Sequence, residues 1–136
     1  MAGYSGTPLV KKLGIKDGAR IAIVNAPEGF HDLLIDLPER VTTLARPRAP
    51  MDWVIFFTNN ERDLIKKFPA LAATLAPTGM LWISWPKKTS PLSTDPAFNE
   101  NRVQRIGLDA GLVDVKVCAI DDDWSGLKFV IRTADR

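Results

Sequence analysis

The chain has 136 residues, of which 46% are hydrophobic and 25% are charged. Because this size and balance are those of an ordinary globular protein, we predict one domain over residues 1–136 and exclude extended disorder and a membrane span. The 18 basic and 16 acidic residues leave a net charge of +2 and are interspersed along the chain, which argues against nucleic acid as a partner.

The cysteine content and the N-terminus indicate where the protein works. The single cysteine, Cys118, excludes an internal disulfide and a cysteine-based zinc site, and its apolar neighbours predict a buried, unreactive thiol. Lys11 and Lys12 follow Leu9 and Val10 directly, so no apolar segment of signal-peptide length is present. We therefore predict a cytoplasmic protein.

The first half of the chain predicts two helices and two strands. Thr7 as a cap, Pro8 in the first position and Gly14 as terminator are typical of a short helix. Residues 20–25 form a nearly unbroken apolar run, which is typical of a buried parallel strand. In chain order we predict a helix over 7–14, a strand over 20–25, a helix over 30–37 and a strand over 41–45.

The second half predicts a longer alternation of strands and helices. Pro69 is expected to kink or split the first of its helices, and Pro77 and Gly79 to end it. The loop over 121–126 has hairpin length, so the last two strands should be antiparallel. We predict a strand over 52–58, a helix over 64–75, a strand over 80–85, a helix over 95–110, and strands over 113–120 and 127–132.

Strands that alternate with helices predict an α/β fold: a three-layer Rossmann-like domain with a mostly parallel sheet and an antiparallel C-terminal strand. This order resembles the class I methyltransferase superfamily, especially its second half. The resemblance implies S-adenosylmethionine as a cofactor, held by a glycine-rich turn after the first strand and an acidic residue after the second.

A second resemblance rests on short motifs. The motifs are YSGTPL at 4–9, NAPEGF at 25–30, WISWPKK at 82–88, LVDVKVCA at 112–119 and WSGLK at 124–128. They resemble a family of small bacterial proteins classed as a domain of unknown function. The resemblance implies a cytoplasmic single-domain protein and supplies no activity.

The cofactor determinants of a methyltransferase are altered in this sequence. Of the expected glycines after the first strand only Gly29 is present, and Pro27 removes a backbone donor. Near the end of the second strand the sequence has Arg46, not an acid. Because both determinants depart from the pattern, we predict no cofactor.

The carboxyl ends of the parallel strands are where an open α/β sheet binds ligands. The loops there contribute the candidate ligand-binding residues Asn25, Glu28, Gly29, Arg46, Asn59, Trp85, Lys87 and Lys88. The two adjacent lysines can hold a phosphate or carboxylate, or simply form a solubilising turn. The arginine can pair with a phosphate, although a solvated loop residue explains it as well.

The remaining polar residues predict no metal site and no assigned catalytic group. Three consecutive acids over 121–123 converge poorly on one ion, so a structural turn is favoured. His31 is the only histidine, and with Glu28 and Asp32 it permits acid–base chemistry, but the start of a helix explains both carboxylates.

Three functions are compatible with these patterns. The first is a methyltransferase-like domain without catalysis that binds an anionic small molecule or a protein partner through the edge of its sheet. The alternative is an S-adenosylmethionine- or nucleotide-dependent transferase with an atypical cofactor loop, in which Asn25 or Glu28 lies near the cofactor. The third is a self-associating protein, for which exposure of Trp53 or Trp124 would be the sign.

Overall fold

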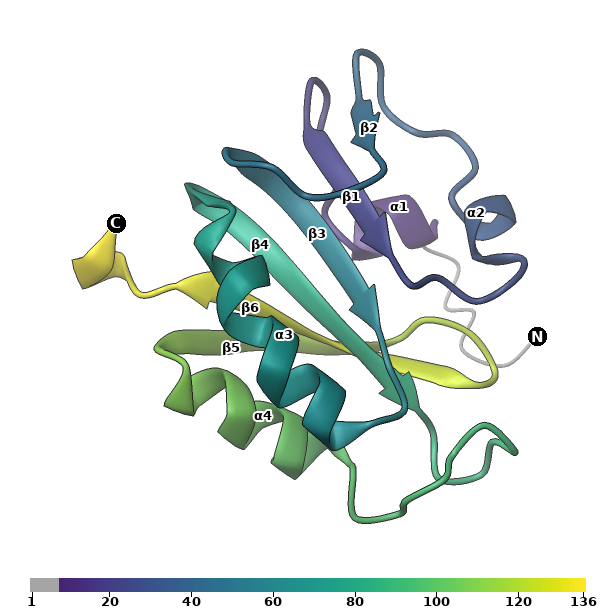
Figure 1. Cartoon of the computed structure of the whole chain (residues 1–136). Coiled ribbons are helices and arrows are strands. Elements are labelled where there is room, and N and C mark those ends of the chain that lie inside the picture. The colour runs from purple at the N-terminus through teal and green to yellow at the C-terminus, as the bar shows by residue number, and fades with distance from the viewer. Residues whose placement is uncertain (1–7) are drawn as a thin grey trace.

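A computed structural model describes residues 8–136, which form one six-stranded sheet with helices on both faces (Figure 1). The strands are β1 (Arg20–Val24), β2 (Thr42–Leu44), β3 (Met51–Phe57), β4 (Leu75–Pro86), β5 (Leu112–Ala119) and β6 (Trp124–Ile131). The helices are α1 (Leu9–Lys12), α2 (Phe30–Leu33), α3 (Glu61–Ala73) and α4 (Glu100–Asp109), followed by a 3₁₀ turn, η1 (Thr133–Asp135).

The sheet is mostly parallel, as predicted. Its strands lie in the order β2-β1-β3-β4-β6-β5, and the first four are parallel to one another. Strand β6 lies between β4 and β5 and is antiparallel to both. The predicted α/β fold with an antiparallel C-terminal strand is therefore confirmed.

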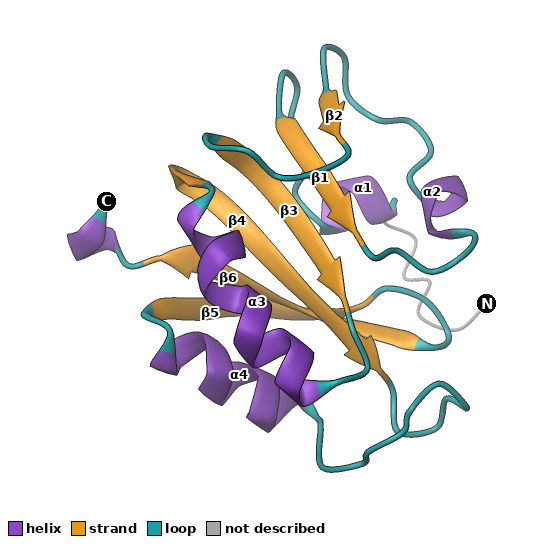
Figure 2. Cartoon of the chain, viewed as in Figure 1, coloured by secondary structure: helices purple, strands orange, loops and turns teal. Residues whose placement is uncertain are grey.

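The two faces of the sheet are covered very differently (Figure 2). Helices α3 and α4 cover one face, where Phe68 and Phe129 pack edge to face at 5.2 Å between ring centroids. The opposite face is covered by the one-turn helices α1 and α2 and the segments around them. There the buried indoles of Trp53 and Trp82 both donate to the backbone oxygen of Leu13, at 2.7 and 2.9 Å.

Several boundaries in the first half differ from the prediction. Helix α1 begins at Leu9, with Pro8 as its cap, and Thr7 lies outside the described residues. Helix α2 ends at Leu33, four residues early, because Leu34 leaves helical geometry and Asp36 has a φ of 60°.

The second half differs from the prediction at the starts of two elements and at Pro69. Strand β4 begins at Leu75, which pairs with Met51, and residues 76–79 then bulge out of register. Helix α4 begins at Glu100, because Asp95 and Ala97 form a separate turn before it. Pro69 does not split the helix, since α3 runs through this residue as one helix.

The tryptophans do not form the exposed patch that would indicate self-association. Trp53 is 1% exposed and Trp124 is 8% exposed. Trp124 opens β6, which shortens the predicted hairpin loop, and its ring packs edge to face on Phe57 at 5.2 Å. In the described part of the chain no helix has the length and hydropathy needed to span a membrane.

Candidate functional site

The turn after β1 keeps the backbone shape that glycines usually provide. Asn25 has a φ of 58° and Gly29 a φ of 87°, both in the left-handed region. Asparagine tolerates this region better than most other residues. The Asn25 side-chain amide also donates to the backbone oxygen of Phe57 at 2.7 Å, which joins the carboxyl ends of β1 and β3. The turn thus has a fixed backbone conformation although it lacks the expected glycines.

The outer side of this turn is open. Gly29 and Glu28 are both exposed, and a side chain built at Gly29 would meet no atom within 4 Å. The backbone at Gly29 is therefore accessible to a ligand. The adjacent Glu28 carboxylate provides oxygens that accept hydrogen bonds from hydroxyl groups.

The residue after β2 does not complete a usual cofactor site. Arg46 is exposed and follows the strand that pairs with β1. A guanidinium has no acceptor atom, so it cannot accept hydrogen bonds from ribose hydroxyls as an acid would.

Asn59, after β3, is used to hold a neighbouring loop. Its side-chain amide donates to the backbone oxygen of Leu92 at 3.3 Å, and its backbone oxygen accepts from the Thr94 hydroxyl at 3.3 Å. These contacts tie the loop over 87–99 to the end of β3. The candidate residue Asn59 therefore has a structural role in this conformation.

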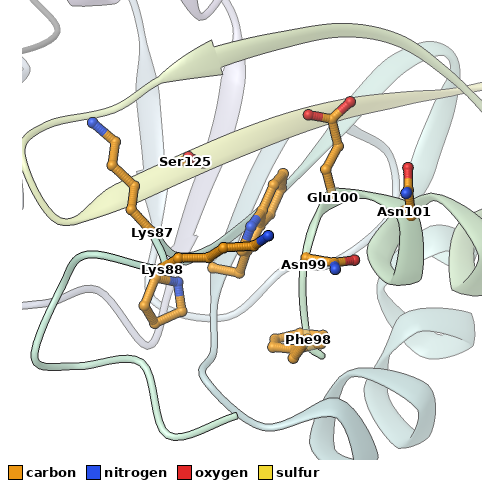
Figure 3. A pocket seen from close by; sticks show the side chains of 9 residues that line it. Lys87, Lys88, Phe98, Asn99, Glu100, Asn101 and Ser125 are labelled. Atoms are coloured by element: carbon orange, nitrogen blue, oxygen red, sulfur yellow. The ribbon is translucent and has the colours of Figure 1, made fainter. Parts of the chain in front are cut away.

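A pocket of about 400 Å³ lies between the end of β4 and the start of α4 (Figure 3). It is lined by Trp85, Pro86, Lys87, Lys88, Phe98, Asn99, Glu100, Asn101 and Ser125. Trp85, Pro86 and Phe98 are buried and provide apolar surface. The remaining lining side chains are polar and are half-buried or exposed. This volume lies within the range of small-molecule pockets.

The charged groups of the pocket have no ion-pair partners among residues 8–136. The three ion pairs there involve none of Lys87, Lys88 and Glu100. Figure 3 shows Lys88 extending toward the start of α4, whereas Lys87 points away from it. The backbone of Lys87 is fixed by a 2.8 Å hydrogen bond to Asp123, so the loop leaves β4 in a defined direction.

The amino-terminal end of α4 adds to the positive character of the pocket. Asn99 caps this ten-residue helix by accepting from the backbone N–H of Arg102 at 3.2 Å. The first-turn N–H groups, together with Lys88, favour a negatively charged ligand, whereas the Glu100 carboxylate of the same turn opposes one.

The structure brings three of the eight predicted residues together and separates the others. Trp85, Lys87 and Lys88 share the pocket. The other five candidates are not among its lining residues: Asn25, Glu28, Gly29, Arg46 and Asn59. Strand β3 separates the turn of β1 from β4.

The sequence interpretation missed the residues that α4 and β6 contribute to the pocket, namely Phe98, Asn99, Glu100, Asn101 and Ser125. The cause is the helix start, which the prediction placed at Asp95 and Pro96. The pair Asn99 and Glu100 is itself a cap followed by a first-turn acid, and it marks the true start.

The other polar candidates have structural explanations. One carboxylate oxygen of Asp121 accepts from the backbone N–H groups of Asp123 and Trp124 at 2.8 and 2.9 Å, which closes the β5–β6 turn. Within residues 8–136 no three His, Cys, Asp or Glu side chains are grouped to hold a metal ion. Cys118 is half-buried, and burial raises the pKa of its thiol while Lys12, Lys116 and Lys128 partly lower it.

Many solved structures share this arrangement of strands and helices. A SAM-dependent methyltransferase from Aquifex aeolicus matches 91% of this chain and 88% of its own, with 17% identity and a TM-score of 0.67. The fold is that of the class I methyltransferases. The fibrillarin pre-rRNA processing protein of Methanococcus jannaschii matches 96% of this chain and 76% of its own, with 13% identity and a TM-score of 0.58.

A third similar structure carries the methyl donor. The magnesium protoporphyrin IX methyltransferase of Synechocystis with bound SAM covers 91% of this chain and 74% of its own, at 12% identity and a TM-score of 0.57. No protein-family model and no curated protein match the sequence. The resemblance to a bacterial family of unknown function therefore stays a prediction.

Proposed function

We propose that this chain is an S-adenosylmethionine-dependent transferase with an atypical cofactor turn, acting on a small acceptor that carries an anionic group. The proposal rests on the methyltransferase fold and on one local observation. The turn after β1 has left-handed backbone at Asn25 and Gly29, and its outer side is open at Gly29. This is the backbone shape for which such folds use glycines.

The residues present fit the cofactor at this turn. The exposed backbone of Gly29 would approach it closely, and the Glu28 carboxylate would accept hydrogen bonds from its ribose hydroxyls. Arg46 does not fit the usual role of the residue after β2, so Glu28 takes over that role in our proposal. When bound, the sulfonium cofactor supplies an electrophilic methyl group.

The acceptor would occupy the pocket between β4 and α4. Lys88 and the first turn of α4 would hold its anionic group, and the buried faces of Trp85 and Phe98 would contact its apolar part. Neighbouring strands lie about 4.8 Å apart, so the ends of β1 and β4, with β3 between them, are about 10 Å apart. This separation suits two ligands that meet above β3.

Titration calorimetry with S-adenosylhomocysteine tests the cofactor part of the proposal. We expect binding to the unmodified chain and a loss of about ten- to a hundredfold in affinity for Glu28→Gln, because a charged hydrogen bond contributes about 1.5–3 kcal/mol. The matched control is Glu39→Gln, another exposed acid of the same segment, which should bind as the unmodified chain does. Equal affinities for both variants would contradict the role of Glu28.

A second candidate is binding of an anionic small molecule without group transfer. It is favoured by Lys87 and Lys88, which form no ion pair within residues 8–136, and by the misfit of Arg46 with a ribose. Pyrophosphate and citrate are suitable probes, with a Lys87→Ala/Lys88→Ala variant and a Lys66→Ala control on exposed α3 surface. Loss of anion binding in the double variant, together with no binding of S-adenosylhomocysteine, would favour this candidate over the transferase.

A further inference from the structure

Three lysines from different parts of the chain lie on the sheet face opposite α3 and α4. Lys116 of β5 is the cross-strand partner of Lys128 of β6, and Lys128 is in turn in register with Trp82. Because residues in register share a face, both lysines lie on the side where Trp82 packs against the α1 segment. Lys16 follows α1 on this same side.

Hydrogen bonding fixes part of this arrangement. The Lys116 ammonium donates to the backbone oxygen of Lys12 at 3.1 Å, so the side chain reaches from β5 to the last residue of α1. We call Lys16, Lys116 and Lys128 the lysine patch. Lys16 and Lys116 are exposed and Lys128 is half-buried.

The three ammonium groups are close enough to influence one another electrostatically. Burial lowers the pKa of the Lys128 ammonium, and the charges of Lys116 and Lys16 lower it further. The charged groups that lower the Cys118 pKa are likewise lysines. Among the described residues, none of the three ion pairs involves a member of the lysine patch.

Aliphatic surface borders the lysine patch. Val113 and Val130 form a cross-strand pair on the same face, and Met80 is in register with Val130 on its other side. All three side chains are half-buried. A ligand at this face therefore meets positive charge and aliphatic surface together.

We propose that the lysine patch binds an acidic segment of a partner protein, one in which carboxylates are interspersed with aliphatic residues. Charge complementarity supports this occupant over the others. A second copy of the chain docked by two-fold symmetry would place like charges against each other. The lysine ammonium is a compact charge that pairs with single carboxylates and needs no bidentate geometry.

The chemistry of the surface favours a protein over nucleic acid. The large hydrophobic residues exposed in the described part of the chain are all aliphatic: Leu33, Ile35, Leu37, Ile65, Leu92, Val115 and Val117. No Phe or Trp side chain is therefore exposed there as a platform for base stacking, and the lysine patch as defined contains no arginine. This site is distinct from the β4–α4 pocket and does not depend on the proposed transferase.

Fluorescence anisotropy with labelled probes tests the proposal. The probes are a peptide of alternating Glu and Leu, the same peptide with Gln in place of Glu, and a single-stranded oligonucleotide of matched charge. The test variant is Lys16→Gln/Lys116→Gln, and the control is Arg62→Gln/Lys66→Gln on exposed α3 surface. All four positions are exposed, and unfolding midpoints measured in parallel verify that both variants fold.

We expect the acidic peptide to bind and its affinity to fall about tenfold in the test variant at low salt, with less than a twofold change in the control. The Gln peptide should not bind. Equal losses in both variants, or no binding of the acidic peptide, would overturn the proposal. Tighter binding of the oligonucleotide that is lost in the test variant would also overturn it, in favour of a nucleic-acid surface.

Discussion

Asn25 combines two properties that its neighbours in the sequence do not reveal. It takes a left-handed conformation, and it uses its side-chain amide to join β1 to β3. The sequence correctly showed that glycines were missing from this turn. It did not show that the backbone shape is kept, because left-handed φ values at an asparagine depend on a tertiary hydrogen bond and not on a local pattern.

Lys128 provides a prediction at the scale of one residue. Because burial and the nearby charges of Lys116 and Lys16 lower its pKa in the folded chain, its charged form is disfavoured there relative to the unfolded chain. The resulting destabilisation is fully present below the folded-state pKa. It disappears as the pH rises above the ordinary lysine value of 10.5.

We therefore expect Lys128→Met to raise the thermal midpoint at pH 7, and expect this gain to shrink as the pH approaches and passes 10.5. Thermal unfolding followed by circular dichroism at several pH values measures both effects. Lys66→Met, on exposed α3 surface, is the control. A loss of stability at neutral pH, or a gain that grows with pH, would contradict the argument.

At the scale of elements, one backbone oxygen next to α1 is bonded from two strands of the sheet. A helix of four residues has almost no stability of its own. The Leu13 oxygen just after it accepts from the buried indoles of both Trp53 and Trp82, so two strands hold the same segment. Both tryptophans therefore have a structural role, and their presence in the sequence does not require a partner protein.

Because both indoles share this acceptor, we expect the effects of substituting Trp53 and Trp82 on the free energy of unfolding to be non-additive. Trp53→Phe or Trp82→Phe alone leaves the oxygen one donor, whereas the double variant leaves a buried carbonyl without either indole, which costs about 1–3 kcal/mol. The free energy lost by the double variant should exceed the sum of the two single losses by about 1 kcal/mol. Urea unfolding of the four proteins measures this coupling, and strict additivity would show that the oxygen finds another donor.

Helix α4 approaches the sheet closely at one glycine. A side chain at Gly107 would come within 2.0 Å of the buried Phe129 ring, which itself packs on Phe68. We expect Gly107→Ala to lower the free energy of unfolding by about 1–3 kcal/mol through overpacking, despite the better helix propensity of alanine. Asp109→Ala, on the exposed end of α4, should stay within about 0.5 kcal/mol. Similar urea midpoints for both variants would contradict this account of the packing.

Element boundaries were predictable where the local signal and the tertiary contacts agree. The apolar run of β3 and the spacing of apolar residues in α3 identified both elements, although Pro69 was expected to disrupt the helix. The start of β4 was missed because Leu75 joins the sheet through pairing with Met51, a contact between residues distant in the sequence. The start of α4 was missed because the turn at Asp95 carries the same signals as a helix cap.

At the scale of the whole molecule, strand alternation predicted the α/β class, and the hairpin length predicted an antiparallel last pair. The insertion of β6 between β4 and β5 was not specified by either pattern. That insertion brings Ser125 to the pocket, and the start of α4 supplies Glu100. The sequence thus identified Lys87 and Lys88 as residues of the pocket, but it did not identify Glu100 and Ser125, which line the pocket from α4 and β6.

Our central claim is that S-adenosylmethionine binds at the turn after β1. The most direct measurement is a titration of the isotope-labelled protein with S-adenosylhomocysteine, followed by amide chemical shifts. We predict saturable shifts for Glu28, Gly29 and their neighbours in the turn, with smaller shifts at the ends of β3 and β4. The absence of shifts at the turn with millimolar ligand, or shifts confined to the β4–α4 pocket, would contradict the claim.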